Sequence, residues 1–221
     1  MIPRHFARTS LETFEPRPGT EHAHEYIVGY ARGYPAEQAG ILLVGPPGVG
    51  KTHLVAGIVR HLTLEKGISC MFKDFFLLIS EVKEAYDAGR YEADILKPLA
   101  EVEVLVVDEL GKGRTHSDWE QGLLDEIICK RYNQMKTTIL TTNFPLEYPD
   151  PRRRPPHGER NMRGGLSSGR SNLADALAQP TLEDRVGKRI LSRLRQMCMI
   201  FRMEKAADYR LVKGPASRGL S

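Results

Sequence analysis

Short apolar runs alternate with longer segments of helical periodicity along most of this chain. The apolar runs predict strands at residues 41–44, 68–73, 102–108, 137–142 and 198–203. Helical spacing of apolar positions predicts helices at residues 22–33, 52–66, 75–88, 118–134 and 181–196. Strands that are apolar almost throughout are typical of a parallel sheet covered on both faces. The alternation of strands and helices therefore predicts an α/β domain.

One segment interrupts this alternation. Residues 147–180 hold many Pro, Gly, Arg and Ser residues and no long apolar pattern. A segment of that length and composition is typical of a functional or disordered insert rather than of a second core. We expect three parts, namely an extended lead-in and a helix over 1–35, a domain over 36–213 that contains the 147–180 insert, and a disordered tail over 214–221.

Composition excludes a mainly disordered chain, a fibrous protein and a membrane protein with several spanning helices. Of the 221 residues, 41% are hydrophobic and 27% are charged, values typical of a soluble globular chain. No apolar run reaches the roughly 18 residues of a membrane-spanning helix, and the first residues lack the apolar core of a signal peptide. We expect a cytoplasmic protein with no membrane partner. Its three scattered cysteines, Cys70, Cys129 and Cys198, are expected to be buried free thiols.

The positive charge is concentrated late in the chain. The formal net charge is +4, yet the residues from Arg185 onward carry ten Lys or Arg against two acids. The insert adds further arginines. This distribution allows an anionic partner such as nucleic acid, and it equally fits a solvated basic face.

A phosphate-binding loop follows the first predicted strand. The sequence GPPGVGKT fits the pattern G-x-x-x-x-G-K-[ST], and a helix follows it. Glycines allow backbone N–H groups to surround phosphate oxygens, and the start of the helix favours an anion. The lysine can reach the β- and γ-phosphates, and the threonine hydroxyl can bind Mg²⁺. The candidate nucleotide-binding residues are Gly45, Pro46, Pro47, Gly48, Val49, Gly50, Lys51 and Thr52.

Two acidic residues end the third predicted strand. The sequence VLVVDE has the Walker B form. Asp108 is then placed to hold the Mg²⁺ shell, and Glu109 to polarise a water for attack on the γ-phosphate. The segment between the lysine of the loop and these acids predicts one strand inserted between the two nucleotide-binding strands. This arrangement favours an NTPase that activates water over a simple kinase.

Asn143 ends the fourth predicted strand, where its amide is a candidate to orient the attacking water or contact the γ-phosphate. Several Lys and Arg residues share the helix predicted over 181–196, and an arginine there could act in trans on a neighbouring subunit's nucleotide. Spacing alone does not select which arginine. Trp119 shares helical spacing with Leu123 and Ile127, which favours core packing over base stacking.

Together these motifs resemble the AAA+ ATPases of the DnaC/IstB type, the bacterial helicase loaders and transposition helper ATPases. The resemblance covers about Phe14 to Arg210. The segments GPPGVGKTHL, VLVVDELG and TILTTN are similar to the family's P-loop, Walker B strand and sensor 1 strand. The P-loop extension adds His53 to the candidate nucleotide-binding residues. The segments LEDRVGKRILSRLRQM and ADYRLV are similar to its arginine-finger helix and terminal segment.

The resemblance implies a P-loop NTPase fold of the AAA+ type, with the additional strand and the catalytic Glu. It implies a five-stranded parallel sheet of order 5-1-4-3-2, flanked by helices, without a separate lid domain. The implied activity is hydrolysis of ATP with Mg²⁺ bound by Thr52 and Asp108. Glu109 and Asn143 act on one side of a subunit interface and Arg193 comes from the next subunit. The implied partners are single-stranded DNA, a replicative helicase or a transposase, and further copies of the chain.

The chain departs from typical loaders in two places. Only about forty residues precede the P-loop, fewer than a separate helicase-binding domain needs, and the 147–180 insert is unusual. A helicase loader or replication accessory factor is our first hypothesis, and an IstB-like helper with a transposase client is the alternative. A small-molecule kinase with an arginine-rich lid and an ATP-gated binding module are rivals from other classes.

Overall fold

A computed structural model describes residues 2–36, 39–113, 117–148, 180–203 and 206–209. Within these residues the strands are β1 (Gly40–Val44), β2 (Cys70–Asp74), β3 (Val104–Asp108), β4 (Thr137–Thr142) and β5 (Cys198–Arg202). The helices are η1 (Arg4–Phe6), α1 (Glu21–Gly33), α2 (Lys51–Lys66), α3 (Phe75–Asp87), α4 (Glu92–Glu101), α5 (Asp118–Asn133), α7 (Leu182–Val186) and α8 (Lys188–Met197).

The five strands form one sheet in the order β2-β3-β4-β1-β5. Every neighbouring pair is parallel. Read from the other edge, this order is the 5-1-4-3-2 that the resemblance implied, so that prediction is confirmed. β4 lies between β1 and β3, as expected for an inserted strand. The carboxyl ends of β1, β3 and β4 therefore meet at one edge of the sheet.

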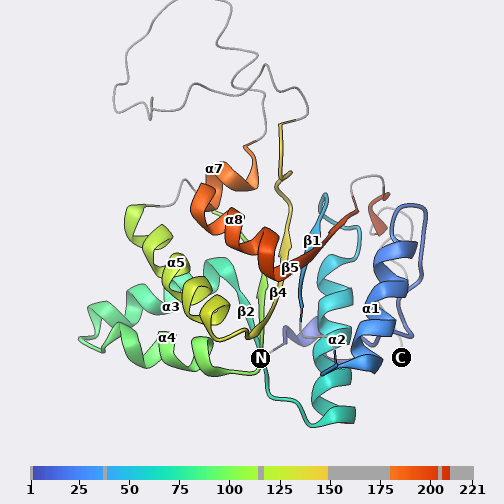
Figure 1. The fold of residues 1–221 in the computed structure, drawn as a ribbon, viewed down its shortest axis with the longest axis horizontal. Helices are drawn as coiled ribbons and strands as arrows, with labels where there is room; N and C mark the ends of the chain where they lie inside the picture. Colours follow the sequence, from blue (N-terminus) through green and yellow to red (C-terminus); the bar gives the residue numbers. More distant parts are fainter. Residues whose placement is uncertain (1, 37–38, 114–116, 149–179, 204–205, 210–221) are drawn as a thin grey trace, which may run out of the picture.

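Helices cover both faces of the sheet (Figure 1). Alternate residues of each buried strand point to opposite faces. Leu42, Leu105 and Leu140 pack with apolar residues of α3, α4, α5, α7 and α8. Their strand neighbours Ile41 and Val106 pack with α1, α2 and the lead-in. β1, β3 and β4 are thus buried on both sides, which explains why β1 and β3 are almost entirely apolar.

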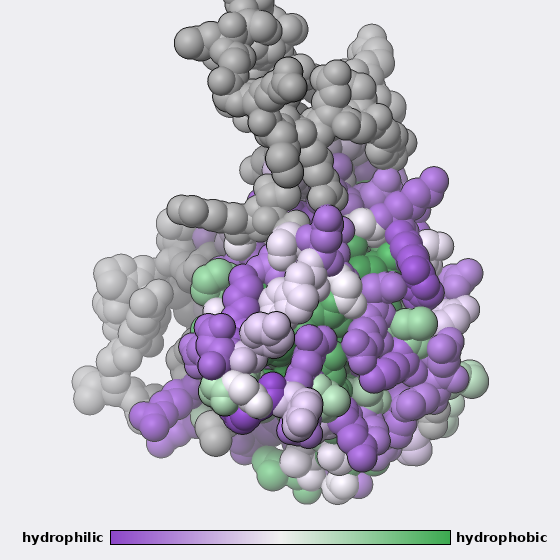
Figure 2. Space-filling model, turned by 90° about the vertical axis from the view of Figure 1, so that its left-hand side faces the viewer, coloured by the Kyte–Doolittle hydropathy of each residue, from purple (hydrophilic) through white to green (hydrophobic). Residues whose placement is uncertain are grey.

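Figure 2 views the molecule from the side of α3, α4 and α5 and shows a mostly hydrophilic surface with some hydrophobic residues between. Trp119 is 37% exposed, and the Lys83 ammonium lies 5.8 Å from its ring centroid. The prediction that Trp119 packs in the core is therefore wrong. It lies in the first turn of α5, and the buried side of that helix begins only at Leu123.

The predicted helix over 181–196 is in fact two helices. α7 begins with a capping box between Thr181 and Asp184, and the chain turns at Gly187, whose φ of 87° and ψ of 153° are not helical. Helix α4 was not predicted. It contains Pro98, a residue that argues against a helix in any single-sequence reading.

The lead-in is less extended than expected. It contains the short helix η1, and Leu11 and Phe14 are buried against the face of α2. Of the three cysteines, which are free, Cys198 is buried whereas Cys70 and Cys129 are half-buried. The prediction of three buried thiols is thus correct for one. None of the described helices is long and apolar enough to cross a membrane. Residues 149–179 of the insert and the predicted tail lie outside the described residues.

Arg131 of α5 is completely buried, which no sequence pattern indicated. Its guanidinium donates to the carbonyl oxygens of Leu99 and Val102, at 2.8 and 2.9 Å, and its Nε donates to the hydroxyl of Thr138 at 2.9 Å. Burial lowers the pKa of Arg131 to about 10, so the side chain remains cationic at neutral pH. The Arg131 side chain thus links the end of α4 to α5 and β4 through hydrogen bonds.

Candidate nucleotide site

The loop after β1 folds tightly around the start of α2. Gly48 and Gly50 have positive φ values of 82° and 101°, a conformation that favours glycine. A Cβ on Gly48 would lie 1.9 Å from a carboxylate oxygen of Asp208, and one on Gly50 would lie 2.6 Å from the ring of Phe14. The loop therefore needs these glycines for its own shape and for two segments that pack on it. Val49 is fully buried and anchors the loop in the core.

Lys51 and Asn143 meet at the carboxyl edge of the sheet. The Lys51 side chain is only 6% exposed. Its Nζ donates to the carbonyl oxygens of Gly45 and Pro46, at 2.7 and 2.8 Å, and to Oδ1 of Asn143 at 2.8 Å. The structure thus joins the ammonium group of the P-loop to the amide that the sequence placed at the end of β4.

Asp108 lies among hydroxyl groups. The Thr52 hydroxyl is 3.1 Å from both carboxylate oxygens, and the Thr141 hydroxyl donates to Oδ1 at 2.5 Å. Burial raises the pKa of Asp108 above its ordinary value, against the lowering effect of these hydrogen bonds. Thr141 was not predicted as a site residue. In the sequence, only the run of threonines in TILTTN indicated a hydroxyl group here. The contact itself depends on β4 lying beside β3, which brings the Thr141 side chain to Asp108.

Thr52 and Asp108 fit a magnesium site. They present a hydroxyl and a carboxylate side by side next to the phosphate loop, and Mg²⁺ prefers oxygen ligands. Among the described residues no three His, Cys, Asp or Glu side chains cluster as a metal site. A Mg²⁺ ion held by one or two protein oxygens commonly completes its coordination with phosphate and water.

Glu109 follows Asp108 in a left-handed conformation, with φ of 56°. Its backbone N–H donates to the Thr141 hydroxyl at 2.9 Å. Its carboxylate forms an ion pair with Lys112, and that hydrogen bond raises the pKa of the lysine. Lys112 was missed by the sequence reasoning, although its position three residues after Glu109 and between two glycines made a turn there predictable.

A cavity of about 840 Å³ lies over this edge of the sheet. Nine predicted site residues line it, namely Pro47, Gly48, Gly50, Lys51, Thr52, His53, Asp108, Glu109 and Asn143. The lead-in and the terminal segment also line it, and neither was predicted to. Tyr209 donates its N–H to the Gly48 carbonyl at 2.9 Å, and the Arg17 guanidinium lies 4.6 Å from the Tyr209 ring centroid. The volume lies within the range of small-ligand sites.

His53 connects the P-loop helix to the lead-in. Its Nε2 lies 3.2 Å from the carbonyl oxygen of Ser10 and 3.2 Å from the Thr13 hydroxyl. Burial lowers the pKa of His53, and the nearby His24 lowers it further, against the raising effect of the Ser10 carbonyl.

This lowered pKa predicts a pH dependence of stability. Below pH 6.5, the ordinary value for histidine, the unfolded chain takes up a proton at this position more readily than the folded chain. The stability that neutral His53 contributes is therefore present above that pH and is lost as the pH falls towards the folded-state pKa. Thermal unfolding midpoints of the wild type and His53→Gln at pH 7.5 and 5.5, without nucleotide, test this. We expect a larger fall for the wild type, and an equal fall in both proteins would contradict the prediction.

Arg193 lies apart from this cavity. It belongs to α8, which covers the opposite face of the sheet from α2 (Figure 1). Its Nη1 donates to Oδ1 of Asp125 at 2.6 Å, and it is absent from the lining of the cavity. The structure thus brings the other predicted catalytic residues together in one chain and leaves Arg193 outside, as a residue acting in trans would be.

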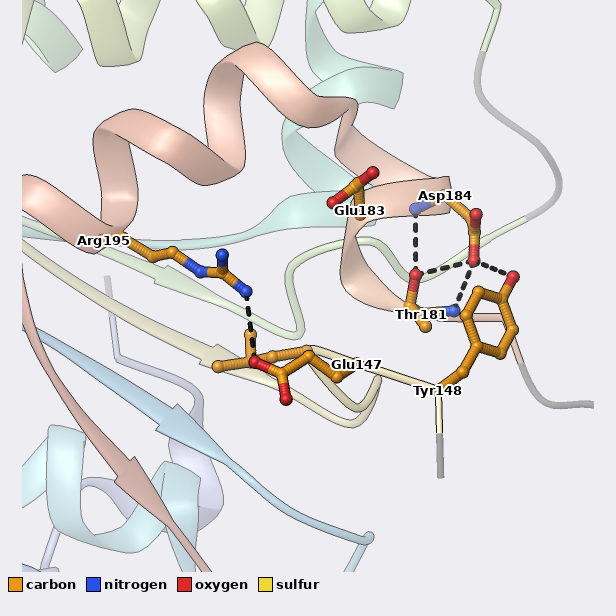
Figure 3. Close-up of a pocket in the computed structure, with 7 residues that line it drawn as sticks. Glu147, Tyr148, Thr181, Glu183, Asp184 and Arg195 are labelled. Carbon is orange, nitrogen blue, oxygen red and sulfur yellow. Dashed lines mark hydrogen bonds and ion pairs between the residues drawn. The ribbon is translucent and has the colours of Figure 1, made fainter. Parts of the chain in front are cut away.

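A second cavity, of about 380 Å³, lies between the end of β4 and α7 (Figure 3). Several of its polar groups contact one another. Asp184 accepts hydrogen bonds from Thr181, as the helix cap, and from the Tyr148 hydroxyl at 2.5 Å. Arg195 contacts Glu147 at 3.4 Å. These contacts account for the cavity as a local packing feature.

The fold and the site define an ATP-binding protein of the AAA+ type. A family model described as "IstB-like ATP binding protein" matches residues 30–150. The match covers more than half of the chain, which therefore belongs to the family of IstB-like ATP-binding proteins.

Individual relatives agree with this membership. The replicative helicase loader DnaC of Escherichia coli K12 is 30% identical over 119 residues, which are 53% of this chain and 48% of that protein. A putative insertion sequence ATP-binding protein of Sinorhizobium fredii is 30% identical over 163 residues, 68% of this chain and 53% of that protein. The chain spans about half the length of the curated relatives it matches. A crystal structure of the DnaC helicase loader superposes with a TM-score of 0.68 at 28% identity, covering 90% of this chain and 99% of that one.

Proposed function

We propose that this chain hydrolyses ATP and uses the cycle to act on DNA, as a helicase loader or a replication accessory factor. The observation that carries the enzymatic part is the convergence of Lys51, Thr52, Asp108, Glu109 and Asn143 on one cavity. Lys51 binds the β- and γ-phosphates, and Asn143 orients the water beside the γ-phosphate. Glu109 accepts a proton from that water as it attacks.

Thr52 and Asp108 would hold the magnesium ion through a hydroxyl and a carboxylate oxygen. When bound, Mg²⁺ neutralises charge on the phosphates. The domain boundaries are part of the same proposal, with residues 36–213 as the ATPase domain.

Release of Glu109 from Lys112 is a required step. The Lys112 Nζ contacts the Glu109 carboxylate directly, so the carboxylate oxygen that faces Lys112 is not open to a water molecule. Glu109 accepts the proton of water only after it leaves this contact. The ATP-bound assembly, in which a neighbouring subunit adds Arg193, provides the opportunity for that change.

The DNA-directed part is supported by the DnaC relatives, since the solved DnaC structure covers nearly all of this chain. An insertion-sequence ATP-binding protein also matches, over a larger share of the chain than the DnaC sequences do. This favours a second candidate, a transposition helper whose client is a transposase. Both candidates share the ATP site, self-association through that site, and contact with DNA.

The test is the steady-state ATP hydrolysis rate with and without single-stranded DNA, at about 50 and 200 mM salt. We expect the DNA to raise the rate several-fold at low salt, and the increase to shrink at high salt because phosphate contacts are screened. Lys51→Ala is the control for contaminating ATPases. A rate indifferent to DNA would contradict the DNA-directed part and favour a protein client. Transfer of phosphate to a small molecule, without free phosphate, would replace the ATPase with a kinase.

A further inference from the structure

The carboxylate of Asp125, on α5, contacts two arginines of α8. Oδ1 of Asp125 accepts a hydrogen bond from Nη1 of Arg193 at 2.6 Å, and Oδ2 lies 3.6 Å from Nε of Arg189. The two helices pack directly on each other, and Leu194 of α8 is in the same core cluster as Leu124 of α5. The contact therefore spans the junction between two packed helices.

Arg193 is restrained more than the arginines beside it. Its side chain is 19% exposed and that of Asp125 is 25% exposed. Arg189, by contrast, is 72% exposed, and Arg195 reaches its acidic partner only at 3.4 Å. A short, partly buried and charge-assisted hydrogen bond is stronger than an exposed ion pair. Among the described residues, Asp125 is therefore the group that decides where the Arg193 guanidinium lies.

The contact still leaves Arg193 able to bind an anion. A guanidinium carries five N–H donors, and one of them is bonded to Asp125. The remaining donors are available for phosphate oxygens from a neighbouring subunit. Asp125 itself does not line the nucleotide cavity of its own chain. It is thus placed to act on the arginine and not on the nucleotide.

From this geometry we infer that Asp125 is a positioning residue for the ATPase reaction. It holds Arg193 in the orientation from which the guanidinium meets the γ-phosphate bound by the next subunit. The inference rests on the proposed function, in which Arg193 acts in trans. Physically, a long arginine side chain loses rotamer entropy when it is fixed. If Asp125 fixes the Arg193 side chain before the subunits meet, this loss of rotamer entropy no longer adds to the free energy of the transition state.

The first experiment compares Asp125→Ala with Glu126→Ala. Glu126 is the next residue of α5, and its carboxylate pairs with Lys130 on the surface of the same helix. We expect Asp125→Ala to lower kcat for ATP hydrolysis about 10- to 100-fold with unchanged binding of fluorescent ATP, and Glu126→Ala to match the wild type. Asp125→Asn, which keeps an acceptor oxygen, should lose less. Wild-type turnover in Asp125→Ala would overturn the inference.

The second experiment separates positioning from general damage to the fold. Lys51→Ala lacks a working P-loop but carries an intact Asp125 and Arg193. Mixed with Asp125→Ala, it supplies a positioned arginine to intact nucleotide sites, so the mixture should hydrolyse ATP faster than the sum of its parts. Arg193→Ala mixed with Lys51→Ala is the reference and should recover in the same way.

The outcomes of the two experiments are distinguishable. If ATP hydrolysis recovers in the Arg193→Ala mixture but not in the Asp125→Ala mixture, Asp125 acts elsewhere. This result would overturn the inference and leave the proposed function intact. Full activity of Arg193→Ala by itself would instead contradict the trans-acting role of Arg193 in the proposed function, on which the inference rests. If Asp125→Ala does not fold, as judged by its thermal unfolding, Asp125→Asn replaces it in both experiments and the same outcomes decide.

Discussion

Replacing Glu109 by Gln is expected to lower the steady-state rate of ATP hydrolysis by about 10²- to 10⁴-fold, the usual contribution of a general base. The amide has the size of the carboxylate but cannot accept a proton from water at neutral pH. The backbone hydrogen bond from Glu109 to Thr141 does not involve the side chain and should persist. The lysine, both threonines and Asp108 remain in place, so ATP should still bind. The measurement pairs phosphate release with equilibrium binding of a fluorescent ATP analogue.

A matched control for this variant is Glu81→Gln. Glu81 lies on α3, where it pairs with Lys73, and it does not line the nucleotide cavity. The Glu81→Gln variant should hydrolyse ATP at the wild-type rate. Undiminished turnover in Glu109→Gln would remove the assigned base, and loss of ATP binding would mean that the ion pair with Lys112 supports the shape of the pocket instead.

Replacing Arg193 by Ala is expected to reduce hydrolysis to a similar extent, by about 10³-fold or more, because an arginine supplied in trans stabilises charge in the transition state of phosphoryl transfer. ATP binding to the separate subunit should not weaken, since Arg193 lies outside the cavity of its own chain. The measurement is kcat over a range of protein concentrations, with ATP affinity determined at low concentration.

Arg189→Ala provides the control for Arg193. Arg189 is on the same helix, shares the carboxylate of Asp125 and is far more exposed. It should keep most of the wild-type kcat. The reverse result, with hydrolysis lost in Arg189→Ala and retained in Arg193→Ala, would show that the trans-acting arginine was assigned to the wrong position.

The strands and the main site residues were predictable because local rules decide them. β1 and β3 are buried on both faces and are therefore apolar, whereas the buried β4 is recognised by its β-branched residues. The P-loop needs its glycines for close backbone approach. The break at Gly187 was harder to see. A single glycine inside an otherwise helical pattern costs about 1 kcal/mol, which the neighbouring helix-forming residues can offset, and only its observed dihedral angles reveal two helices.

The remaining site residues depend on long-range packing. Thr141 reaches Asp108 because β4 happens to lie beside β3, and Tyr209 reaches Gly48 across most of the length of the sequence. No local pattern encodes such contacts. The position of Trp119 was predicted wrongly for a related reason. Helical spacing identifies a stripe of residues but not the turn at which the stripe becomes buried.

The nucleotide cavity is lined at once by residues of the lead-in, such as Phe14 and Arg17, by the P-loop and by Tyr209. ATP bound in this cavity would contact segments that are distant in the sequence, so detaching any one of them would remove part of the binding free energy. At an ATP concentration 100 times the dissociation constant, binding adds about 2.7 kcal/mol to the stability of the closed arrangement. A bound nucleotide would therefore act as a removable cross-link between early and late parts of the chain.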